Sequence, residues 1–352
     1  MAGIWMDQKC PFHKFCALAA LITPPLLSLA YKRSNSTSSA IQKPVKTLPM
    51  PKCETPELEK AITAVLNSSV KIAEALRSTT LGATVAGTTN NSGDAQLGLD
   101  LLTDEISFQE LKKSEVFLNG ISEETPTFVP MTPSAPFTVS FDPLDGSSVI
   151  GPNFAVGGIY AIWPACATLV GSPGRSCLAS IVVMYGSRLT AYVAVRGEGC
   201  KELTYVVDPG AWVCTKERVE VKEKKVFAPG NLRATQDSKK YEALIQGYIK
   251  NRYTLRYSGG MVPDVVHILS KGGGVFTNVS SDKAKAKLRF LYEVVGVALV
   301  VEESGGKFLS EKDGGKDVLD LVCDDVDMRV GGAAGSVEEC QKYLSIMFKT
   351  RV

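Results

Sequence analysis

Histidine is scarce in this sequence. Only two of the 352 residues, His13 and His267, are histidines. Because histidine is the commonest metal ligand and the usual base of a Ser-His-Asp triad, its scarcity argues against a histidine-rich zinc site and against such a triad. Any acid–base chemistry is therefore expected to depend on carboxylates.

Cysteine is not rare, but it shows no pairing pattern. The nine cysteines are scattered, odd in number and never spaced as Cys-x-x-Cys. In a chain of this length such usage is typical of thiols in a reducing compartment. It argues against a disulfide framework.

An excess of charge of one sign is lacking as well. The formal net charge is +2, and no block of Lys or Arg dominates. The stretch Lys222-Glu223-Lys224-Lys225 is mixed in sign and is typical of a solvated strand end. We therefore expect no nucleic-acid partner. With 45% hydrophobic and 22% charged residues, the chain is predicted to be globular and long enough for one or two domains.

The first 52 residues differ from the rest. An apolar run from Phe15 to Ile22 is short and is followed by two prolines, so no stable membrane insertion is expected. Ser28-Leu29-Ala30 offers a small-x-small cleavage site, and residues 31–47 are rich in Ser, Thr, Lys and Arg without any acid. We interpret residues 1–52 as a targeting segment, with a disordered tail as the alternative. If it is a targeting segment, we expect the protein to be imported into a plastid; the alternative location is the cytoplasm.

The remaining chain alternates between helical and strand patterns. Helix-period patterns cover residues 55–76, 94–118, 239–250 and 261–269, and an apolar run over 288–301 ends at a helix stop. Strand-like runs cover 137–139, 154–163, 180–185, 189–195 and 226–228. This mixture predicts a layered α/β or α+β fold. Asp208-Pro209-Gly210 suggests a division into residues 53–208 and 209–352.

The stretch Asp142-Pro143-Leu144-Asp145-Gly146-Ser147-Ser148 carries the most specific chemistry. Its two carboxylates, together with Glu123-Glu124 shortly before, suit a hard cation such as Mg²⁺. Gly146 permits a tight turn, and Ser147 and Ser148 offer N–H and hydroxyl groups to an anion. A metal cage beside an anion turn is what a phosphate-ester hydrolase needs.

Other charged residues extend this pattern. Asp94, Asp100 and Glu293 lie in or beside apolar stretches, where a carboxylate needs a partner or a metal. The alternative is that they lie on the polar faces of amphipathic helices. Arg256-Tyr257 and Lys287-Leu288-Arg289 place cations at the start of apolar segments, which suits phosphate binding. The alternative is that these cations are ordinary basic residues exposed to solvent.

These motifs together resemble the sugar bisphosphatases, the superfamily of fructose-1,6-bisphosphatase and sedoheptulose-1,7-bisphosphatase. The resemblance runs in order from about Pro56 to Phe348. The quoted motifs are Ser122-Glu123-Glu124, Phe141 to Ser148, Arg256-Tyr257-x-Gly-x-Met261-Val262-x-Asp264-Val265 and Lys287-Leu288-Arg289-x-x-Tyr292-Glu293. It implies alternating helix and sheet layers (αβαβα) with an N-terminal metal and phosphate subdomain and a C-terminal sugar-binding subdomain.

The resemblance also implies a role for each matching residue. Metal ligands would be Glu123, Glu124, Asp142, the Leu144 carbonyl, Asp145 and Glu293; water-activating acids would be Glu124, Asp94 and Asp100. Substrate would contact Asp145, Gly146, Ser147, Ser148, Asn231, Arg256, Tyr257, Met261, Lys287 and Arg289. Two or three Mg²⁺ ions are implied, with Mn²⁺ as a substitute. The arginine that matches Arg256 can reach into a neighbouring subunit in the family, which implies a homodimer or homotetramer.

Details favour the sedoheptulose-bisphosphatase branch. The stretches 229–235, 253–265 and 276–279 resemble that branch, and Thr277-Asn278 stands where fructose-bisphosphatases carry a phosphate-contacting Tyr. The cysteine pair of the plant enzymes is replaced by residues 80–87 without cysteine, so thioredoxin control through it is not expected. A fructose-1,6-bisphosphatase, a dual-specificity enzyme and a catalytically inactive homologue remain as alternatives.

Overall fold

The computed structural model describes residues 51–78, 85–89 and 95–348. All of them belong to a compact unit formed by residues 47–352. Asp94 and almost all of the predicted targeting segment lie outside the described residues. Among the described residues, no helix is both long enough and apolar enough to cross a membrane.

The larger sheet has eight strands in the order β10-β9-β8-β7-β6-β5-β3-β4, antiparallel except for the parallel pair β3 and β5. Its strands are β3 (Phe117–Ser122), β4 (Val129–Pro130), β5 (Phe137–Asp145), β6 (Val156–Pro164), β7 (Ala179–Tyr185), β8 (Leu189–Val195), β9 (Gly199–Val206) and β10 (Ala211–Lys216). A separate antiparallel pair, β1 (Val85–Thr89) and β2 (Ala95–Leu97), precedes it in the chain.

The second sheet has five strands in the order β12-β11-β13-β15-β14. They are β11 (Lys222–Gly230), β12 (Thr254–Leu255), β13 (Gly273–Asn278), β14 (Gly306–Ser310) and β15 (Gly332–Ser336). The charged residues Lys222–Lys225 are exposed at the start of β11, as predicted for a solvated strand end.

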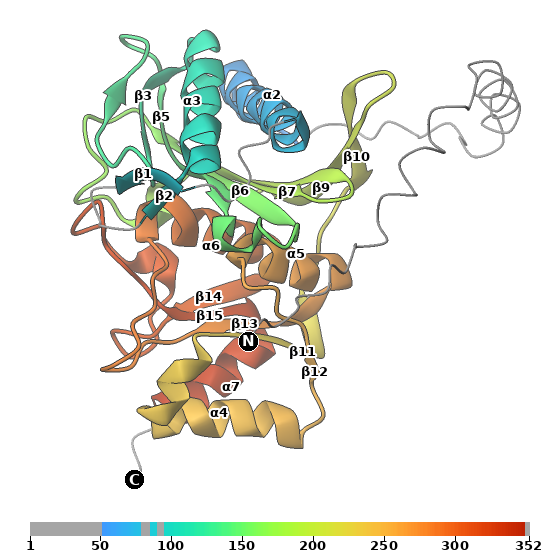
Figure 1. Ribbon diagram of the computed structural model, residues 1–352, viewed down its shortest axis with the longest axis vertical. Coiled ribbons are helices and arrows are strands. Elements are labelled where there is room, and N and C mark those ends of the chain that lie inside the picture. The colour runs from blue at the N-terminus through green and yellow to red at the C-terminus, as the bar shows by residue number, and fades with distance from the viewer. Residues whose placement is uncertain (1–50, 79–84, 90–94, 349–352) are drawn as a thin grey trace, which may run out of the picture. The chain divides into compact units, whose positions relative to one another are not determined.

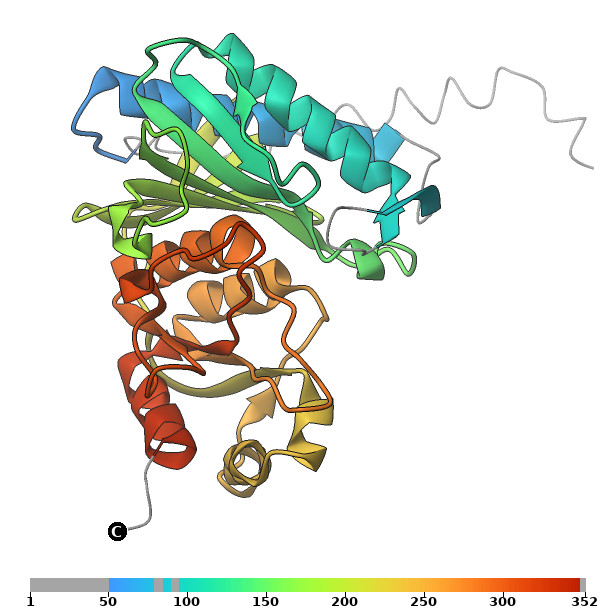
Figure 2. The same ribbon diagram turned by 90° about the vertical axis from the view of Figure 1, so that its left-hand side faces the viewer.

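Three helix layers alternate with the two sheets (Figures 1 and 2). α2 (Pro56–Ser78) and α3 (Gly98–Lys113) cover the outer face of the large sheet, and α5 (Met261–Lys271) and α6 (Val295–Glu303) pack between the sheets. α4 (Lys239–Lys250) and α7 (Val337–Met347) cover the outer face of the second sheet. The predicted αβαβα layering is therefore confirmed.

This layering explains the burial pattern of the middle elements. All nine residues of β5 are buried, because helices cover both faces of the large sheet. In α6 every residue from Val295 to Val301 is buried, as expected for a helix that is apolar on all sides and lies between two sheets.

Two predicted boundaries differ from the structure. Residues 94–118, predicted as one helix, hold β2, α3 and the start of β3; α3 ends where Ser114 and Glu115 close a turn, with Glu115 at a φ of 57°. Apolar residues in both strand and helix had produced one continuous pattern. Asp208-Pro209-Gly210 lies in the turn between β9 and β10, so the chain changes sheets after β10 and not at residue 208.

Candidate active site

A pocket of about 330 Å³ lies where the end of β5 meets the start of α5 and the segment before α6. Most predicted site residues line it: Asp100, Glu123, Glu124, Asp142, Leu144, Asp145, Gly146, Ser147, Ser148, Tyr257, Met261, Lys287, Arg289 and Glu293. The structure thus brings together residues that are almost 200 positions apart in the sequence.

The end of β5 is shaped to present two carboxylates. Its pairing with β6 shifts register between Asp142 and Asp145, which leaves room for Pro143 inside the strand. The Leu144 N–H donates to Asp142 Oδ1 at 2.9 Å. Gly158 on β6 makes this irregularity possible, since a Cβ there would lie only 2.9 Å from the Pro143 carbonyl oxygen.

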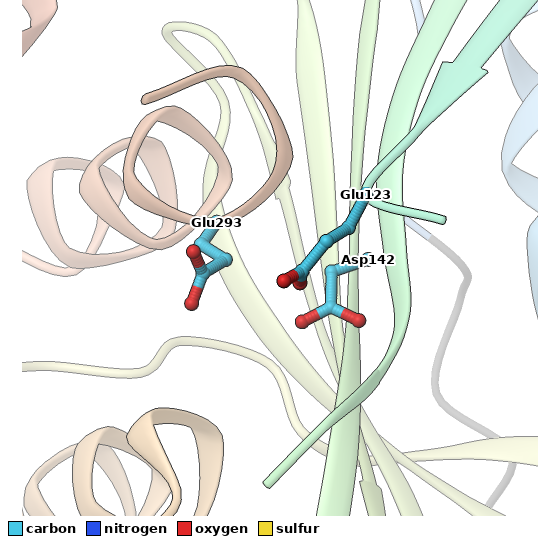
Figure 3. Close-up of side chains that lie close together, drawn as sticks. All are labelled: Glu123, Asp142 and Glu293. Carbon is cyan, nitrogen blue, oxygen red and sulfur yellow. The ribbon is translucent and has the colours of Figure 1, made fainter. Parts of the chain in front are cut away.

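Three carboxylates from separate elements converge beside this strand end. Glu123 follows β3, Asp142 lies on β5, and Glu293 lies in the π-helical turn Phe290–Val294 that leads into α6. Each offers an oxygen, and these three oxygens lie within 4.8 Å of one another. Figure 3 shows the side chains of Glu123, Asp142 and Glu293 around a common space between the β5 region and the helical turn.

Arg289 is the cation that accompanies this cluster. Its side chain is almost fully buried, and its guanidinium forms an ion pair with Glu123. Its main-chain N–H also donates to Glu293. The extended backbone at Arg289 forms an isolated β-bridge with Arg329. The π-helical turn begins at the next residue, so its start is held by this bridge. π-helical turns are rare and often occur at functional sites.

The electrostatics of the cluster favour an added cation. Burial, followed by the charges of Glu123, Asp145 and Glu293, raises the pKa of Asp142 well above its usual range. Burial and the charge of Glu123 also raise the pKa of Glu293. Burial is the main cause that raises the pKa of Asp145 to about 7. Buried carboxylates in such proximity require protons or a cation, and an all-oxygen donor set suits Mg²⁺.

The turn after Asp145 depends on a glycine. Gly146 has a φ of 86° and precedes a single 3₁₀ turn, Ser147–Val149. Its positive φ disfavours any other residue, and a Cβ at Gly146 would make a tight contact of 3.3 Å with the Cα of Gly260. Ser147 and Ser148 both line the pocket.

The N-terminus of α5 is joined to this turn. The main-chain N–H of Val262 donates to Asp145 Oδ2 at 2.6 Å. Asp264, which had not been predicted as a site residue, also lines the pocket and accepts from the Ser258 N–H at 2.6 Å. Burial raises the pKa of Asp264 to about 6. Its place within the quoted motif that begins at Arg256 was the available sequence indication.

Of the three predicted water-activating acids, Asp100 and Glu124 are described by the structure and Asp94 is not. Asp100 is buried in the first turn of α3, and Glu124 lies in the turn after β3. That turn is closed by the Thr125 N–H, which donates to Ser122 Oγ at 2.9 Å, and it is tied to α3 by the Thr125 hydroxyl, which donates to Asp104 at 2.8 Å. Asp94 lies outside the described residues.

Two predicted substrate residues do not line the pocket. The side-chain amide of Asn231 donates to the carbonyls of Val279 and Ala284 at 2.8 and 3.0 Å, because its left-handed backbone (φ 48°) turns it toward that loop. Arg256 is exposed and donates to the Leu255 carbonyl at 2.7 Å. The prediction that Arg256 reaches a neighbouring subunit is not tested by a single chain.

Two sequence families match this chain in succession. Residues 51–217 match the N-terminal domain of fructose-1,6-bisphosphatase, and residues 221–348 match its C-terminal domain. Together they cover nearly all of the described chain. The chain belongs to the fructose-1,6-bisphosphatase family. The predicted enzyme class, a sugar bisphosphatase and hence a phosphoric monoester hydrolase, is confirmed, and the family is metal-dependent.

Relatives come from both branches of this family. The chain is 38% identical to the chloroplastic sedoheptulose-1,7-bisphosphatase of Spinacia oleracea, over 94% of this chain and 88% of the relative. It is 34% identical to the class 1 fructose-1,6-bisphosphatase of Citrifermentans bemidjiense, over 80% of this chain and 85% of the relative.

Solved structures agree with these relatives. A Toxoplasma gondii protein, provisionally assigned as a sedoheptulose-1,7 bisphosphatase, superposes with a TM-score of 0.77 at 35% identity, over 83% of this chain and 94% of that one. The fold is also similar to that of Leishmania major fructose-1,6-bisphosphatase, with a TM-score of 0.76 at 24% identity, over 86% of this chain and 100% of that one.

Proposed function

We propose that this sugar bisphosphatase removes the 1-phosphate of sedoheptulose 1,7-bisphosphate and yields sedoheptulose 7-phosphate and inorganic phosphate. The observation that carries the proposal is the carboxylate cluster of Glu123, Asp142 and Glu293 in a pocket that also contains the Gly146–Ser148 turn and Lys287. Three relatives, from Spinacia oleracea, Triticum aestivum and Chlamydomonas reinhardtii, are named chloroplastic sedoheptulose-1,7-bisphosphatases.

Mg²⁺ is the proposed cofactor, with two or three ions per subunit and Mn²⁺ as a substitute. Glu123, Asp142, Asp145 and Glu293 would hold it, with help from Glu124 and the Leu144 carbonyl. The raised pKa values of Asp142, Asp145 and Glu293, caused first by burial and then by neighbouring carboxylates, fit this role, because a bound cation would favour the ionised carboxylates. Bound Mg²⁺ would polarise the phosphate and activate water.

The chain's own residues would complete the chemistry. The Gly146–Ser148 turn orients the 1-phosphate through its N–H groups and hydroxyls. Glu124 or Asp100 accepts the proton from the attacking water, with Asp94 as a further candidate. Tyr257, Met261 and Lys287 bind the sugar and the distal phosphate, with Arg289 beside them; Arg256 would act from a neighbouring subunit of a homodimer or homotetramer.

The stretch Thr277-Asn278 supports the proposed preference for the seven-carbon sugar. Asn278 lines the pocket, and the resemblance places a phosphate-contacting tyrosine of fructose-bisphosphatases in this stretch. A smaller side chain leaves room for a longer sugar. Because class 1 fructose-1,6-bisphosphatases are also relatives, fructose 1,6-bisphosphate is the second candidate substrate, and dual specificity is a third outcome.

Import into a plastid is the proposed destination. It is supported by the composition of residues 1–52 and by the chloroplastic location in the names of the plant and algal relatives. Sequencing the N-terminus of the mature protein would test it. An intact Met1 in protein recovered from its source would favour the cytoplasmic alternative.

Parallel phosphate-release assays on the two bisphosphates test the substrate. We expect a higher kcat/KM for sedoheptulose 1,7-bisphosphate; hydrolysis of the fructose compound alone would refute the first choice. Omission of Mg²⁺ and the variant Asp145→Ala should each abolish release. Unchanged hydrolysis in either would refute the assigned metal site, and an inactive wild type would indicate a regulatory homologue.

A further inference from the structure

The loop that leads from β13 to Lys287 is fixed by a side chain from another part of the second sheet. Glu311 follows β14, and its carboxylate accepts both the main-chain N–H and the hydroxyl of Ser280, the latter at 2.6 Å. The Ser280 Oγ in turn accepts from the main-chain N–H of Ala286 at 2.9 Å. Because Ala286 directly precedes Lys287, a continuous series of hydrogen bonds joins Glu311 to the residue next to Lys287.

The Glu311 carboxylate occupies a closely fitted place. The Glu311 N–H donates to the Gly331 carbonyl at 2.8 Å. A Cβ at Gly331 would lie 2.8 Å from Glu311 Oε1 and 2.5 Å from the Asn278 carbonyl oxygen, so glycine is the residue that fits there. The neighbouring Val330 N–H donates to the Leu288 carbonyl at 3.0 Å. One segment thus supports both Glu311 and the backbone just after Lys287.

The far side of the same loop has its own supports. The Ser281 hydroxyl donates to Asp237 at 2.8 Å and accepts from the Ala284 N–H at 3.1 Å. The Asn231 amide donates to the Ala284 carbonyl at 3.0 Å. These bonds shape the middle of the loop, whereas Ser280 and its partner Glu311 control the end that joins Lys287.

We propose that Glu311 is a positioning residue for the distal phosphate: through Ser280 and Ala286 it fixes the direction in which Lys287 enters the pocket. This inference rests on the proposed function, in which Lys287 binds that phosphate. The lysine side chain is flexible, so it loses conformational entropy when it binds a phosphate. A fixed backbone at Lys287 reduces this loss and thereby strengthens binding. A carboxylate that accepts two hydrogen bonds provides a strong anchor.

Steady-state kinetics of Glu311→Ala test the proposal. With the sugar bisphosphate we expect KM to rise about 10-fold, since loss of hydrogen bonds to a charged group typically costs this factor or more, while kcat changes less than about 2-fold. With the matching sugar 1-phosphate, which lacks the distal phosphate, KM should stay at the wild-type value. An equal rise of KM for both substrates, or no rise for either, would overturn the proposal.

Two further variants separate positioning from general destabilisation. Ser280→Ala removes the link to Ala286 and leaves the main-chain bond to Glu311; it should raise KM for the bisphosphate by itself and add little in the double variant with Glu311→Ala. The exposed Glu338→Ala, which removes the same charge from α7, should leave both KM values unchanged. Additive effects of the first two variants would contradict the proposed series of hydrogen bonds.

A binding measurement keeps this inference separate from the proposed reaction. If the wild type hydrolyses no bisphosphate, the proposed function fails, and positioning is then judged from the Tm shift that sedoheptulose 7-phosphate produces. A smaller shift in Glu311→Ala than in the wild type supports the role of Glu311. An identical shift in both proteins refutes it.

Discussion

The main-chain N–H of Val262 donates to Asp145 Oδ2 at 2.6 Å and thereby attaches the first turn of α5 to the end of β5. Asp145 is therefore both a candidate metal ligand and a structural acceptor between two layers. The same contact places Gly260 against Gly146. The end of β5, the Gly146 turn and the start of α5 are held in one arrangement by this hydrogen bond.

Asp145→Asn separates these two roles. The amide oxygen can still accept from Val262, whereas the negative charge for the metal is lost. Because bound metal stabilises the transition state by several kcal/mol, we expect kcat to fall by at least about 100-fold. Tm without Mg²⁺ should be equal to or above that of the wild type, because one of the mutually repelling charges has been removed. Parallel kinetics and thermal unfolding would check this; a large fall in Tm would show that the structural role dominates.

Stability without metal should decrease as pH rises. The pKa of Asp145 is raised from 3.8 to about 7, so between these pH values the folded protein retains a proton that the unfolded chain has released. The folded state then binds more protons, and the free energy of unfolding falls with pH across this window. The raised pKa values of Asp142 and Glu293 act in the same direction.

Mg²⁺ should reverse this trend. A cation replaces the protons, so we expect saturating Mg²⁺ to raise Tm more at pH 8 than at pH 5. Thermal unfolding at both pH values, with Mg²⁺ and with a chelator, measures the difference. The same experiment on Asp145→Asn provides the control and should show a smaller pH dependence. An equal Mg²⁺ effect at the two pH values would contradict the assignment.

Gly146→Ala should damage the phosphate turn. A non-glycine residue at a φ of 86°, with Gly260 only 3.3 Å from its Cβ, must strain or displace the turn. Such strain is of the order of 1–3 kcal/mol. We expect a lower denaturation midpoint and a strongly reduced kcat. Gly197→Ala is a matched control, because Gly197 also has a positive φ (78°) but no atom within 4 Å of its Cβ position; activity should survive there.

Asn278→Tyr should change the choice of sugar. Asn278 lines the pocket, and a tyrosine there would bring into the stretch Thr277-Asn278 the residue type that the resemblance assigns to fructose-bisphosphatases. We expect kcat/KM for the seven-carbon bisphosphate to fall and the ratio of fructose to sedoheptulose activity to rise about 10-fold, the usual effect of one pocket contact. Competition assays with both substrates measure this ratio. Thr277→Ser, a change at a buried neighbour, is the control; a constant ratio in Asn278→Tyr would remove Asn278 from the specificity argument.

The sequence was informative about elements with a strong period and about residues grouped in short motifs. α4 was predicted with its observed ends, and Gly146–Ser148 forms a turn, as its composition indicated; the strand predicted over 137–139 extends to Asp145. It was less informative where apolar residues continue across a change of structure. Residues 94–118 and 288–301 each contain such a change, and the π-helical turn that presents Glu293 has no distinct periodicity.

By itself, the sequence predicted the chemistry of this protein: few histidines, several carboxylates and a Gly-Ser-Ser turn indicate oxygen ligands and phosphate, and its motifs identify the family. The tertiary structure alone decided which of these residues meet. It brought carboxylate oxygens of Glu123, Asp142 and Glu293 within 4.8 Å of one another, bonded the Asn231 amide to the Val279 carbonyl, and connected Glu311 to Ser280. The physical reason is that layer packing and backbone irregularities, which depend on contacts distant in sequence, set the direction of each side chain.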